Sequence, residues 1–377
     1  MRQVVFIKDK VNKHSIRVLI AAFEKWYQNR EYLVLKPEEL IEKSPKNAVV
    51  LISFATGAYK FYQNLSKEIK LLRKDLNTIC GGPHPSARSE DCLNLFDAVC
   101  VGEGEITLKK LIDLSDDSKC EGIFKGVVVE NLDDFKVFPR KMISLGPIEI
   151  IRGCPSRCAY CQTPSLFPHN LRMRSAEMVR DEIKFALSRK GYADARFIAP
   201  DASSYYFDRG VNIKAISHFL ETVRETLGSN GKLFFGTFPS ELDPAGVSKE
   251  LVDLLVKYCD NKLIVLGLQS ASMRMTKKMH RRSGLTHTEK AIDLLKEKNF
   301  EIVVDLIFGL PYEDEESYEE TYNFIQKYKG VVTIHSHPFD PLPGSLWENE
   351  KPTIVPEKLI KAVKSLEGIG RVFGKVV

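Results

Sequence analysis

Short apolar runs alternate with stretches of helically spaced apolar residues along the first 115 residues of the chain. Strands are predicted at residues 4–7, 32–35, 48–53, 78–80 and 98–101. Helices are predicted over residues 14–26 and from Tyr59 to about Arg73, where apolar side chains recur every three or four positions. The continuous apolar run at 48–53 suits a strand that is buried on both faces. Five such strand–helix units predict an α/β domain with a doubly wound, Rossmann-like parallel sheet.

A second alternating series begins after residues 116–146, which are polar and rich in turn residues and are predicted to be a connector. Its strands are predicted at residues 148–151, 196–199, 233–235, 263–266, 302–308 and 331–335. Its helices are predicted at about 176–188, 212–227, 248–258, 288–298 and 316–327. Six strand–helix units predict a partial (β/α)6 barrel of the TIM type, whose functional loops follow the carboxyl ends of the strands. The predicted domains are 1–140 (Rossmann-like domain with connector), 141–346 (barrel) and 347–377 (helix and tail).

Composition and charge restrict the class of protein. The chain has 377 residues, of which 44% are hydrophobic and 28% charged, as in an ordinary folded globular protein. The net charge of +5 is spread along the chain, which disfavours a dedicated DNA-binding face. No apolar run approaches the length of a membrane-spanning helix. The amino-terminal segment lacks the long apolar region of a secretory signal, so a cytoplasmic location is predicted.

Three of the eight cysteines, Cys154, Cys158 and Cys161, lie within eight residues of each other. They occupy a loop with glycine and proline directly after a predicted strand, so their thiolates can converge on one point. Zinc sites and [4Fe–4S] clusters both usually take four protein ligands. Three cysteines therefore favour a [4Fe–4S] cluster with one iron open to a small molecule. A zinc site, or a cluster with a remote fourth cysteine such as Cys259, is the alternative.

The loop Cys154-x3-Cys158-x-Tyr160-Cys161, placed after the first strand of a βα series, resembles that of the radical S-adenosylmethionine (SAM) enzymes. The resemblance covers about residues 146–346. It implies that the three cysteines hold a [4Fe–4S] cluster whose open iron chelates SAM, and that one electron cleaves SAM to a 5′-deoxyadenosyl radical. In this family the aromatic side chain at the position of Tyr160 lies near the adenine. Packing beneath the loop is the alternative for Tyr160.

Later segments follow the order of motifs in the same family. Gln269 and Ser270 follow a predicted strand and precede Arg281 and Arg282, an arrangement that resembles the fourth-strand SAM-binding region. Gly309, in Gly-Leu-Pro, resembles the fifth-strand motif behind the adenine. The resemblance therefore implies that Tyr160, Gln269, Ser270, Arg282 and Gly309 contact SAM. Gln269 and Ser270 could instead be polar caps at a strand end.

Three polar residues are candidates for acid–base chemistry. Asp201 follows the predicted second strand of the barrel, where related enzymes carry acidic residues. A helix N-cap explains Asp201 equally well. His335 and His337 alternate on or after the last predicted strand and are expected to point to the same side. Ordinary hydrogen-bonded histidines are the alternative for this pair.

The first domain resembles the cobalamin-binding domain that precedes the barrel in one large subclass of radical SAM enzymes. The resemblance rests on the strand ends Leu-Ile-Ser-Phe-Ala-Thr (51–56), Gly-Gly-Pro-His-Pro (81–85) and Val-Gly-Glu-Gly-Glu (101–105). It implies that cobalamin contacts residues at these three ends: Ser53, Thr56, Gly81, Gly82, Gly102 and Glu103. The Asp-x-His-x-x-Gly motif that ligates cobalt in cobalamin mutases and methionine synthase is missing. The subclass can also keep this sheet without the cofactor.

The function expected from these resemblances is that of a cobalamin-dependent radical SAM enzyme that methylates an unactivated carbon. The cofactors would be a [4Fe–4S] cluster, SAM and cobalamin. A small molecule, a lipid or a peptide would be the substrate, and a ferredoxin- or flavodoxin-like protein the electron donor. A methylthiotransferase is disfavoured because Cys80, Cys92 and Cys100 do not have the wide spacing of the second cysteine triad in that group. The alternatives are a radical SAM enzyme that does not use cobalamin and a non-catalytic metal-binding protein.

Overall fold

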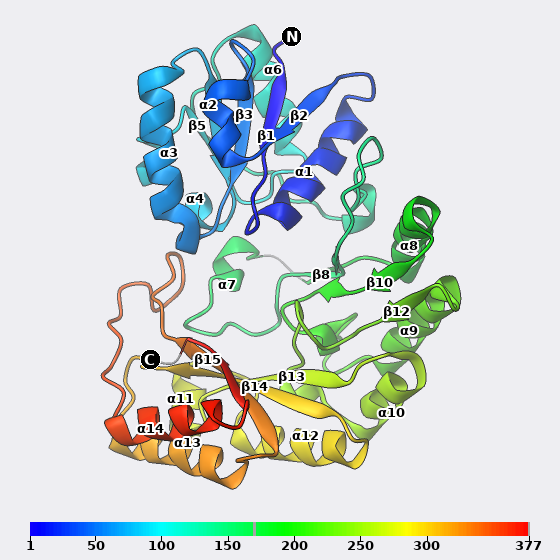
Figure 1. Ribbon diagram of the computed structural model, residues 1–377, viewed down its shortest axis with the longest axis vertical. Helices are drawn as coiled ribbons and strands as arrows, with labels where there is room; N and C mark the ends of the chain where they lie inside the picture. Colours follow the sequence, from blue (N-terminus) through cyan, green and yellow to red (C-terminus); the bar gives the residue numbers. More distant parts are fainter. Residues whose placement is uncertain (169–170, 376–377) are drawn as a thin grey trace. The chain divides into compact units, whose positions relative to one another are not determined.

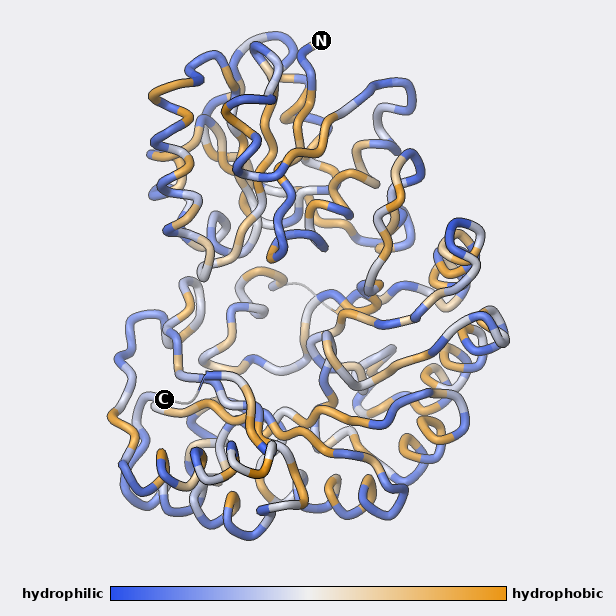
Figure 2. The backbone as a smooth tube through the Cα atoms, viewed as in Figure 1, coloured by the Kyte–Doolittle hydropathy of each residue, from blue (hydrophilic) through white to orange (hydrophobic). Residues whose placement is uncertain are grey.

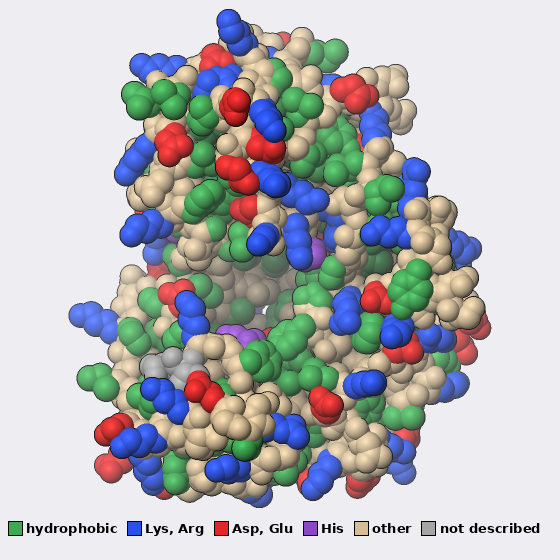
Figure 3. Space-filling model, in the orientation of Figure 1, with side chains coloured by type: hydrophobic (Ala, Val, Ile, Leu, Met, Phe, Trp, Pro, Cys, Tyr) green, Lys and Arg blue, Asp and Glu red, His purple; other side chains and the backbone are tan. Residues whose placement is uncertain are grey.

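The structure is a computed structural model that describes residues 1–168 and 171–375. The chain divides into two compact units, Met1–Gly146 and Pro147–Val377. Figure 1 shows the elements of each unit. Among the described residues, no helix combines the length and the apolar character that crossing a bilayer requires. On the face drawn in Figure 3, basic and acidic side chains are interspersed.

The first unit has a parallel sheet of six strands in the order β2-β1-β3-β4-β5-β6. The strands are β1 (Val4–Ile7), β2 (Tyr32–Leu35), β3 (Val49–Ser53), β4 (Asn77–Gly81), β5 (Ala98–Val101) and β6 (Gly122–Lys125). The helices are α1 (Lys13–Trp26), α2 (Leu40–Lys43), α3 (Tyr59–Leu72), α4 (Pro83–Ala87), α5 (Ser89–Leu93) and α6 (Thr107–Asp117). The strand order reverses between β1 and β3, and ligands of such sheets bind at the carboxyl ends of the strands near this point.

Both faces of this sheet are covered, which explains its apolar strands. Val4 and Phe6 belong to the core that includes residues of α1 and α6. Val5 and Ile7 alternate with them and belong to the core that includes residues of α3. Figure 2 shows the apolar strands and the helices on either side of them.

The sixth strand was not predicted, because residues 116–146 were expected to be a connector. β6 has only four residues at the edge of the sheet, and its side chains alternate between half-buried and exposed. Phe124 packs against the core, whereas Ile123 is exposed. Polar residues surround this short segment, so its apolar pattern is too weak to predict a strand.

The second unit is a curved series of parallel strand pairs flanked by helices. β7 (Ile148–Glu149) pairs with β11 (Phe197–Ile198), and β10 (Ala193–Ala195) pairs with β12 (Gly231–Leu233). Single parallel bridges continue the series from Ala199 to Ser240 and from Leu242 to Leu266. The series ends in a sheet of parallel strands: β13 (Leu263–Gln269), β14 (Glu301–Phe308), β15 (Val332–Pro338) and β16 (Val372–Gly374). β8 (Ile151–Arg152) forms a separate antiparallel pair with β9 (Arg172–Met173).

The helices of the second unit connect these strands. They are α7 (Thr163–Leu166), α8 (Ala176–Lys190), α9 (Ile213–Leu227), α10 (Lys249–Tyr258), α11 (Met273–Lys278), α12 (Leu285–Glu297), α13 (Glu315–Lys327) and α14 (Glu357–Glu367). Ser175, Asn212 and Ser248 cap α8, α9 and α10, because each side chain accepts a hydrogen bond from the first turn of its helix. The carboxyl-terminal segment was predicted as a helix and a tail, but the tail includes β16, which pairs with β15.

Candidate functional site

The cysteine loop follows the first strand segment of the second unit and is held by distant parts of the chain. The backbone N–H of Ala159 donates to the carbonyl oxygen of Met279 at 2.9 Å, and the N–H of Trp347 donates to the oxygen of Ala159 at 3.0 Å. Gln162 Nε2 donates to the oxygen of Pro343 at 2.7 Å. Ala159 and Trp347 also belong to one buried apolar cluster. Segments more than 100 residues away in sequence therefore fix the loop.

The thiols of this loop fit an iron–sulfur cluster better than a single ion. Sulfur ligands of one zinc ion lie about 3.8 Å apart, given Zn–S bonds of about 2.3 Å. Among the described residues, the one group of three ligand atoms within 4.8 Å of one another lies elsewhere, at Asp305, His335 and His337. In a [4Fe–4S] cluster each cysteine binds a different iron, so wider spacing is expected.

Burial affects the chemistry of the same thiols. Cys158 is buried, and Cys154 and Cys161 are half-buried. Burial raises the pKa of Cys154 to about 12 and also raises the pKa of Cys158. Because metal binding requires thiolates, iron must displace these protons when it binds.

Cys259 lies at the opposite edge of the unit. It follows α10 and precedes the amino end of β13, whereas the cysteine loop follows the carboxyl end of a parallel strand segment. The two ends of parallel strands lie at opposite edges of a sheet. A role for Cys259 as a fourth ligand is therefore not supported by its place in the fold.

Arg281 is the basic residue that approaches the cysteine loop. Its Nη1 donates to the Tyr160 hydroxyl at 2.6 Å and lies 3.9 Å from Cys158 Sγ. Its Nη2 donates to the carbonyl oxygen of Gly267 at 2.5 Å, and its side chain is only 9% exposed. This buried positive charge would stabilise the negative charge of bound thiolates. The sequence analysis predicted the neighbouring Arg282, not Arg281, as a contact of SAM. The local sequence does not distinguish the two arginines.

Arg282 and Asp201 form a partly buried ion pair. Arg282 Nη2 lies 3.2 Å from Asp201 Oδ2, and its guanidinium packs over the Phe207 ring. Asp201 Oδ1 accepts hydrogen bonds from the backbone N–H groups of Ser203 and Asp243 at 3.0 and 3.1 Å. Asp201 therefore has the N-cap geometry that the sequence allowed as an alternative. Burial, followed by the charge of Asp243, raises the pKa of Asp201.

Gln269, Ser270 and Gly309 lie together at the carboxyl edge of β13 and β14. Gln269 has a φ of +72°, which is uncommon outside glycine and indicates local strain. Ser270 Oγ accepts a hydrogen bond from the N–H of Ser272 at 3.2 Å. Gly309 has a φ of +75° and lies against the Thr353 carbonyl, which a Cβ would approach to 3.0 Å. The structure thus brings these predicted SAM-binding residues to one edge of the sheet.

A chain of carboxyl and imidazole groups lies on neighbouring strands of the same unit. His335 Nδ1 lies 2.9 Å from Asp305 Oδ1 and 3.0 Å from His337 Nε2. Glu241 hydrogen bonds to Asp305, and burial followed by the Asp305 charge raises the pKa of Glu241 to about 8. Burial raises the pKa of Asp305 to about 7. Burial, followed by the charge of His335, lowers the pKa of His337 to about 4.

Sequence reasoning selected the two histidines but missed Asp305 and Glu241. Asp305 is the acidic residue within the otherwise apolar centre of β14, Ile302–Phe308 in the sequence Ile-Val-Val-Asp-Leu-Ile-Phe. A charged residue inside a buried strand was the available signal. Glu241 lies in an irregular segment, where its local sequence does not distinguish it from exposed acidic residues.

The predicted cobalamin-binding residues lie at the carboxyl ends of β3, β4 and β5 in the first unit. Gly82, with a φ of +100°, packs so closely on β3 that a Cβ would lie 2.9 Å from Ser53 Oγ and from the Phe54 oxygen. Gly102 also has a positive φ, but nothing lies within 4 Å of its Cβ position. Such glycines allow a large ligand to approach the backbone.

Polar groups accompany these glycines. Thr56 Oγ1 lies 3.2 Å from His84 Nδ1, while the buried Nε2 of His84 has no hydrogen-bond partner among the described residues. The side chain of Glu103 accepts from the N–H of Val129 at 3.3 Å. The N–H of Gly102 donates to Ser86 Oγ at 2.9 Å. Open backbone and an orphaned buried nitrogen fit a bulky polar ligand such as cobalamin.

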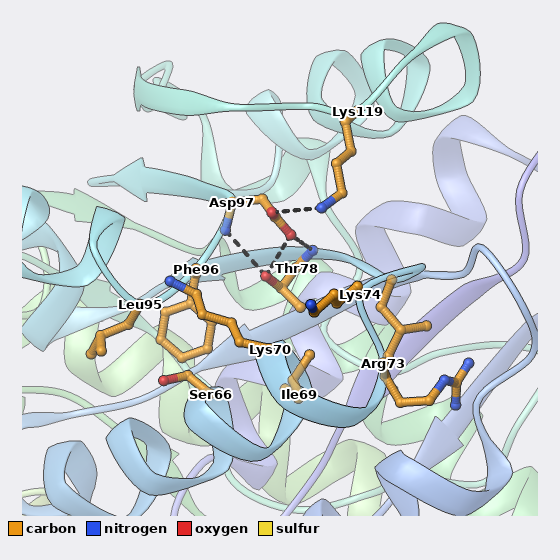
Figure 4. Close-up of a pocket in the computed structure, with 11 residues that line it drawn as sticks. Ser66, Ile69, Lys70, Arg73, Lys74, Thr78, Leu95, Phe96, Asp97 and Lys119 are labelled. Carbon is orange, nitrogen blue, oxygen red and sulfur yellow. Dashed lines mark hydrogen bonds and ion pairs between the residues drawn. The ribbon is translucent and has the colours of Figure 1, made fainter.

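A separate cavity of about 280 Å³ lies at the amino edge of the same sheet (Figure 4). Its basic side chains include Lys119, which pairs with Asp97 at 2.9 Å, and Arg73, which pairs with Asp75 at 3.0 Å. Asp97 also accepts from the N–H of Thr78 at 2.7 Å. These pairings stabilise the strand ends, so we assign this cavity no functional role.

Two family models match the chain. The radical SAM superfamily model matches residues 148–325, and the B12 binding domain model matches residues 15–112. The first match includes the cysteine loop and the strands up to β14. The second runs from within α1 to within α6 and includes the four strands β2 to β5, with the carboxyl ends of β3, β4 and β5.

Curated relatives from Methanocaldococcus jannaschii are similar over most of the chain. The uncharacterized protein MJ1620 is 26% identical, over 85% of this chain and 74% of its own length. The putative methylthiotransferase MJ0865 is also 26% identical, over 74% of this chain. The chain spans 65% of the length of MJ0865, just under two thirds.

Solved structures share the fold of both units. The radical SAM methyltransferase TsrM from Kitasatospora setae, solved with cobalamin and a [4Fe–4S] cluster, has a TM-score of 0.70 at 15% identity. The match covers 92% of this chain and 77% of TsrM. The cobalamin-dependent radical SAM enzyme OxsB has a TM-score of 0.64 at 14% identity, over 99% of this chain and 58% of OxsB. The predicted fold class is confirmed.

Proposed function

We propose that this chain, a radical SAM enzyme with an N-terminal B12-binding domain, transfers a methyl group from cobalamin to an unactivated carbon of its substrate. The two domains imply a [4Fe–4S] cluster, SAM and cobalamin as cofactors. The likeness to TsrM, a methyltransferase with two of these groups bound, supports the proposal. The main support for the proposal is the composition of the carboxyl edge of the first unit. Glycines and polar groups lie there, and no cysteine triad is found among its described residues.

Cys154, Cys158 and Cys161 would hold the cluster in the second unit. When bound, the cluster and SAM supply one-electron cleavage chemistry, and cobalamin supplies the methyl group. Arg281 would stabilise the thiolate charge and orient Tyr160 by its 2.6 Å hydrogen bond. The backbone bonds of Ala159 to Met279 and Trp347 would keep the loop from moving during the reaction.

The other predicted contacts belong to the same proposal. Tyr160, Gln269, Ser270, Arg282 and Gly309 would bind SAM at the carboxyl edge of β13 and β14. Ser53, Thr56, Gly81, Gly82, Gly102 and Glu103 would bind cobalamin at the carboxyl edge of the first sheet. A cytoplasmic location and a ferredoxin- or flavodoxin-like electron donor stay predictions of the sequence. A small molecule, a lipid or a peptide would be the substrate.

A methylthiotransferase is the second candidate, because MJ0865 carries that name. Such an activity needs a second cluster, and the first unit contains Cys80, Cys92 and Cys100. Cys80 and Cys92 are both buried in the core on the α3 side of the sheet. Cys100 belongs to the core on the opposite face. This separation by the sheet favours the methyltransferase.

Iron counting distinguishes the two candidates without knowledge of the substrate. The protein would be reconstituted with iron and sulfide under anaerobic conditions, and its iron and acid-labile sulfide measured. We expect about four irons per chain, unchanged in Cys100→Ala and lost in Cys154→Ala. The Cys154→Ala variant should also form no 5′-deoxyadenosine from SAM. About eight irons per chain, halved by Cys100→Ala, would contradict the methyltransferase and support the methylthiotransferase.

A further inference from the structure

We propose that Asp305, His335 and His337 form a mononuclear site for a divalent transition-metal ion, distinct from the cysteine loop. Their ligand atoms, a carboxylate oxygen and two imidazole nitrogens, all lie within 4.8 Å of one another. Asp305 lies on β14, and both histidines lie on the neighbouring strand β15. Two histidines and one carboxylate are a common ligand set for zinc and for non-haem iron.

Two of the three separations between ligand atoms match those around a metal ion. Ligand atoms bound at about 2.1 Å to one ion lie roughly 3.0 to 3.4 Å apart, depending on whether its geometry is octahedral or tetrahedral. Asp305 Oδ1 lies 2.9 Å from His335 Nδ1, and His337 Nε2 lies 3.0 Å from the same nitrogen. Small rotations of the side chains would suffice to receive an ion.

Hydrogen bonds alone do not account for the contacts of the His335 ring. Nδ1 of His335 lies within hydrogen-bond distance of two partners, yet a ring nitrogen has either one hydrogen or one lone pair. One hydrogen shared between two acceptors gives each a weakened bond. A cation in place of that hydrogen would instead accept a lone pair from all three side chains. The geometry is thus better explained by a bound cation than by a closed hydrogen-bond network.

Neighbouring side chains fix the orientation of His335 and Asp305, the two ligands on which they pack. The Phe373 ring stacks on His335 at a centroid distance of 4.4 Å, and Phe238 contacts its edge at 5.2 Å. Glu241 hydrogen bonds to Asp305. Carboxylate ligands in metal sites are usually hydrogen-bonded in this way, and loss of such a partner weakens metal binding.

Three protein ligands leave coordination positions for water or for an oxygen or nitrogen atom of a substrate. Glu241 also approaches Gly267, where a Cβ would lie 2.6 Å from its Oε2 and 3.4 Å from Arg281 Nη2. Arg281 contacts Cys158, so the metal ligands and the cysteine loop are connected within one unit. If the proposed methyl transfer is correct, the ion would hold a substrate that carries such a donor atom. Metal binding itself does not depend on that function.

Zinc binding to the full chain tests the site directly. The background would be a full-chain variant in which Cys154, Cys158 and Cys161 are serine, so that the loop cannot take the metal. Zinc would be measured after equilibrium dialysis, and the visible absorption of Co2+ would report the coordination geometry of the bound ion. We expect about one zinc per chain, lost in His337→Ala and in Asp305→Asn. Glu241→Ala, which removes the hydrogen-bond partner of Asp305, should weaken binding by about tenfold to a hundredfold.

The exposed histidines His218 and His287 supply the matched control, and their double change to alanine should leave zinc binding unchanged. Circular dichroism would establish that each variant is folded. His337→Gln, which keeps a side chain of similar size, repeats the test if the alanine variant does not fold. Zinc binding that persists in a folded His337 variant, or no zinc binding by the background protein, would overturn the proposal. Neither result would affect the iron count that tests the proposed methyl transfer.

Discussion

Gly82 and Gly102 have similar backbone angles but different surroundings, which makes them a matched pair. Both have a φ near +90 to +100°, a region that side chains rarely adopt. A Cβ at Gly82 would also lie 2.9 Å from Ser53 Oγ and from the backbone oxygen of Phe54. A Cβ at Gly102 would meet nothing within 4 Å.

We therefore expect Gly82→Ala to lower the free energy of unfolding by about 3 kcal/mol, against about 1 kcal/mol for Gly102→Ala. Urea denaturation of both variants would measure this difference. Gly82→Ala should also displace the end of β3 and reduce cobalamin binding. Equal destabilisation by the two substitutions would contradict the close approach at Gly82.

Glu241 gives the second unit a dependence of stability on pH. Its pKa is raised to about 8 by burial and by the charge of Asp305, from an ordinary value of 4.5. The folded protein thus keeps a proton that the unfolded chain releases. The resulting stability is complete below about pH 4.5 and is lost as the pH rises toward 8. The loss has a limiting slope of about 1.4 kcal/mol per pH unit.

Glu241→Gln keeps a neutral hydrogen-bond donor and should flatten this dependence. We expect the variant and the original protein to have similar stability near pH 4.5, and the variant to be more stable at pH 8. Thermal unfolding of metal-free protein across this range would measure the effect. Glu225→Gln, at an exposed position, is the control. Parallel pH profiles for the original protein and Glu241→Gln would refute the assignment.

The segment after β15 packs against the cysteine loop. Trp347 is 6% exposed, packs in the cluster that contains Ala159 and Met279, and donates its N–H to the Ala159 oxygen. Trp347→Ala should lower the free energy of unfolding by about 3–5 kcal/mol. It should also speed the loss of cluster iron to a chelator, because the loop loses its packing partner.

Trp26→Ala provides the comparison for this prediction. Trp26 lies in the first unit, where its Nε1 donates to the Glu105 oxygen at 2.9 Å. Its loss should destabilise the first unit without changing the rate of iron release. If both variants released iron at the same rate as the original protein, the segment around Trp347 would have no part in holding the loop.

The sequence predicts strands that are buried on both faces better than those at the edges. The strand limits at Val4–Ile7 and Ala98–Val101 agree with the structure, because continuous apolar residues mark them. β6 and β16 were missed, since each is short, lies at a sheet edge and is half-exposed. Their positions depend on pairing with a neighbouring strand, which local patterns do not record.

The candidate site shows the same division. The cysteine motif is contiguous, so the sequence identifies it. Arg281, Glu241 and Asp305 come together only through folding, because residues far apart in the chain meet at neighbouring strand ends. The cysteine ligands of the loop can therefore be predicted from the local sequence, whereas the charged residues around the loop can be identified only from the structure.

The whole chain combines two units, each with its own sheet and core and each matched by its own family model. The proposed reaction requires both, because the cysteine loop is in one and the cobalamin edge in the other. A radical SAM enzyme that did not use cobalamin would need only the second unit for its cofactors. Cobalamin binding by the full chain is thus the property that separates these two accounts.

The most direct test is cobalamin retention by the full-length protein. The protein would be purified without oxygen, reconstituted with iron and sulfide, incubated with hydroxocobalamin and passed through gel filtration before its visible spectrum is recorded. We expect about one cobalamin per chain, with less retained by Gly82→Ala than by Gly102→Ala. A spectrum with iron–sulfur absorption alone, and no cobalamin, would contradict cobalamin-dependent methyl transfer.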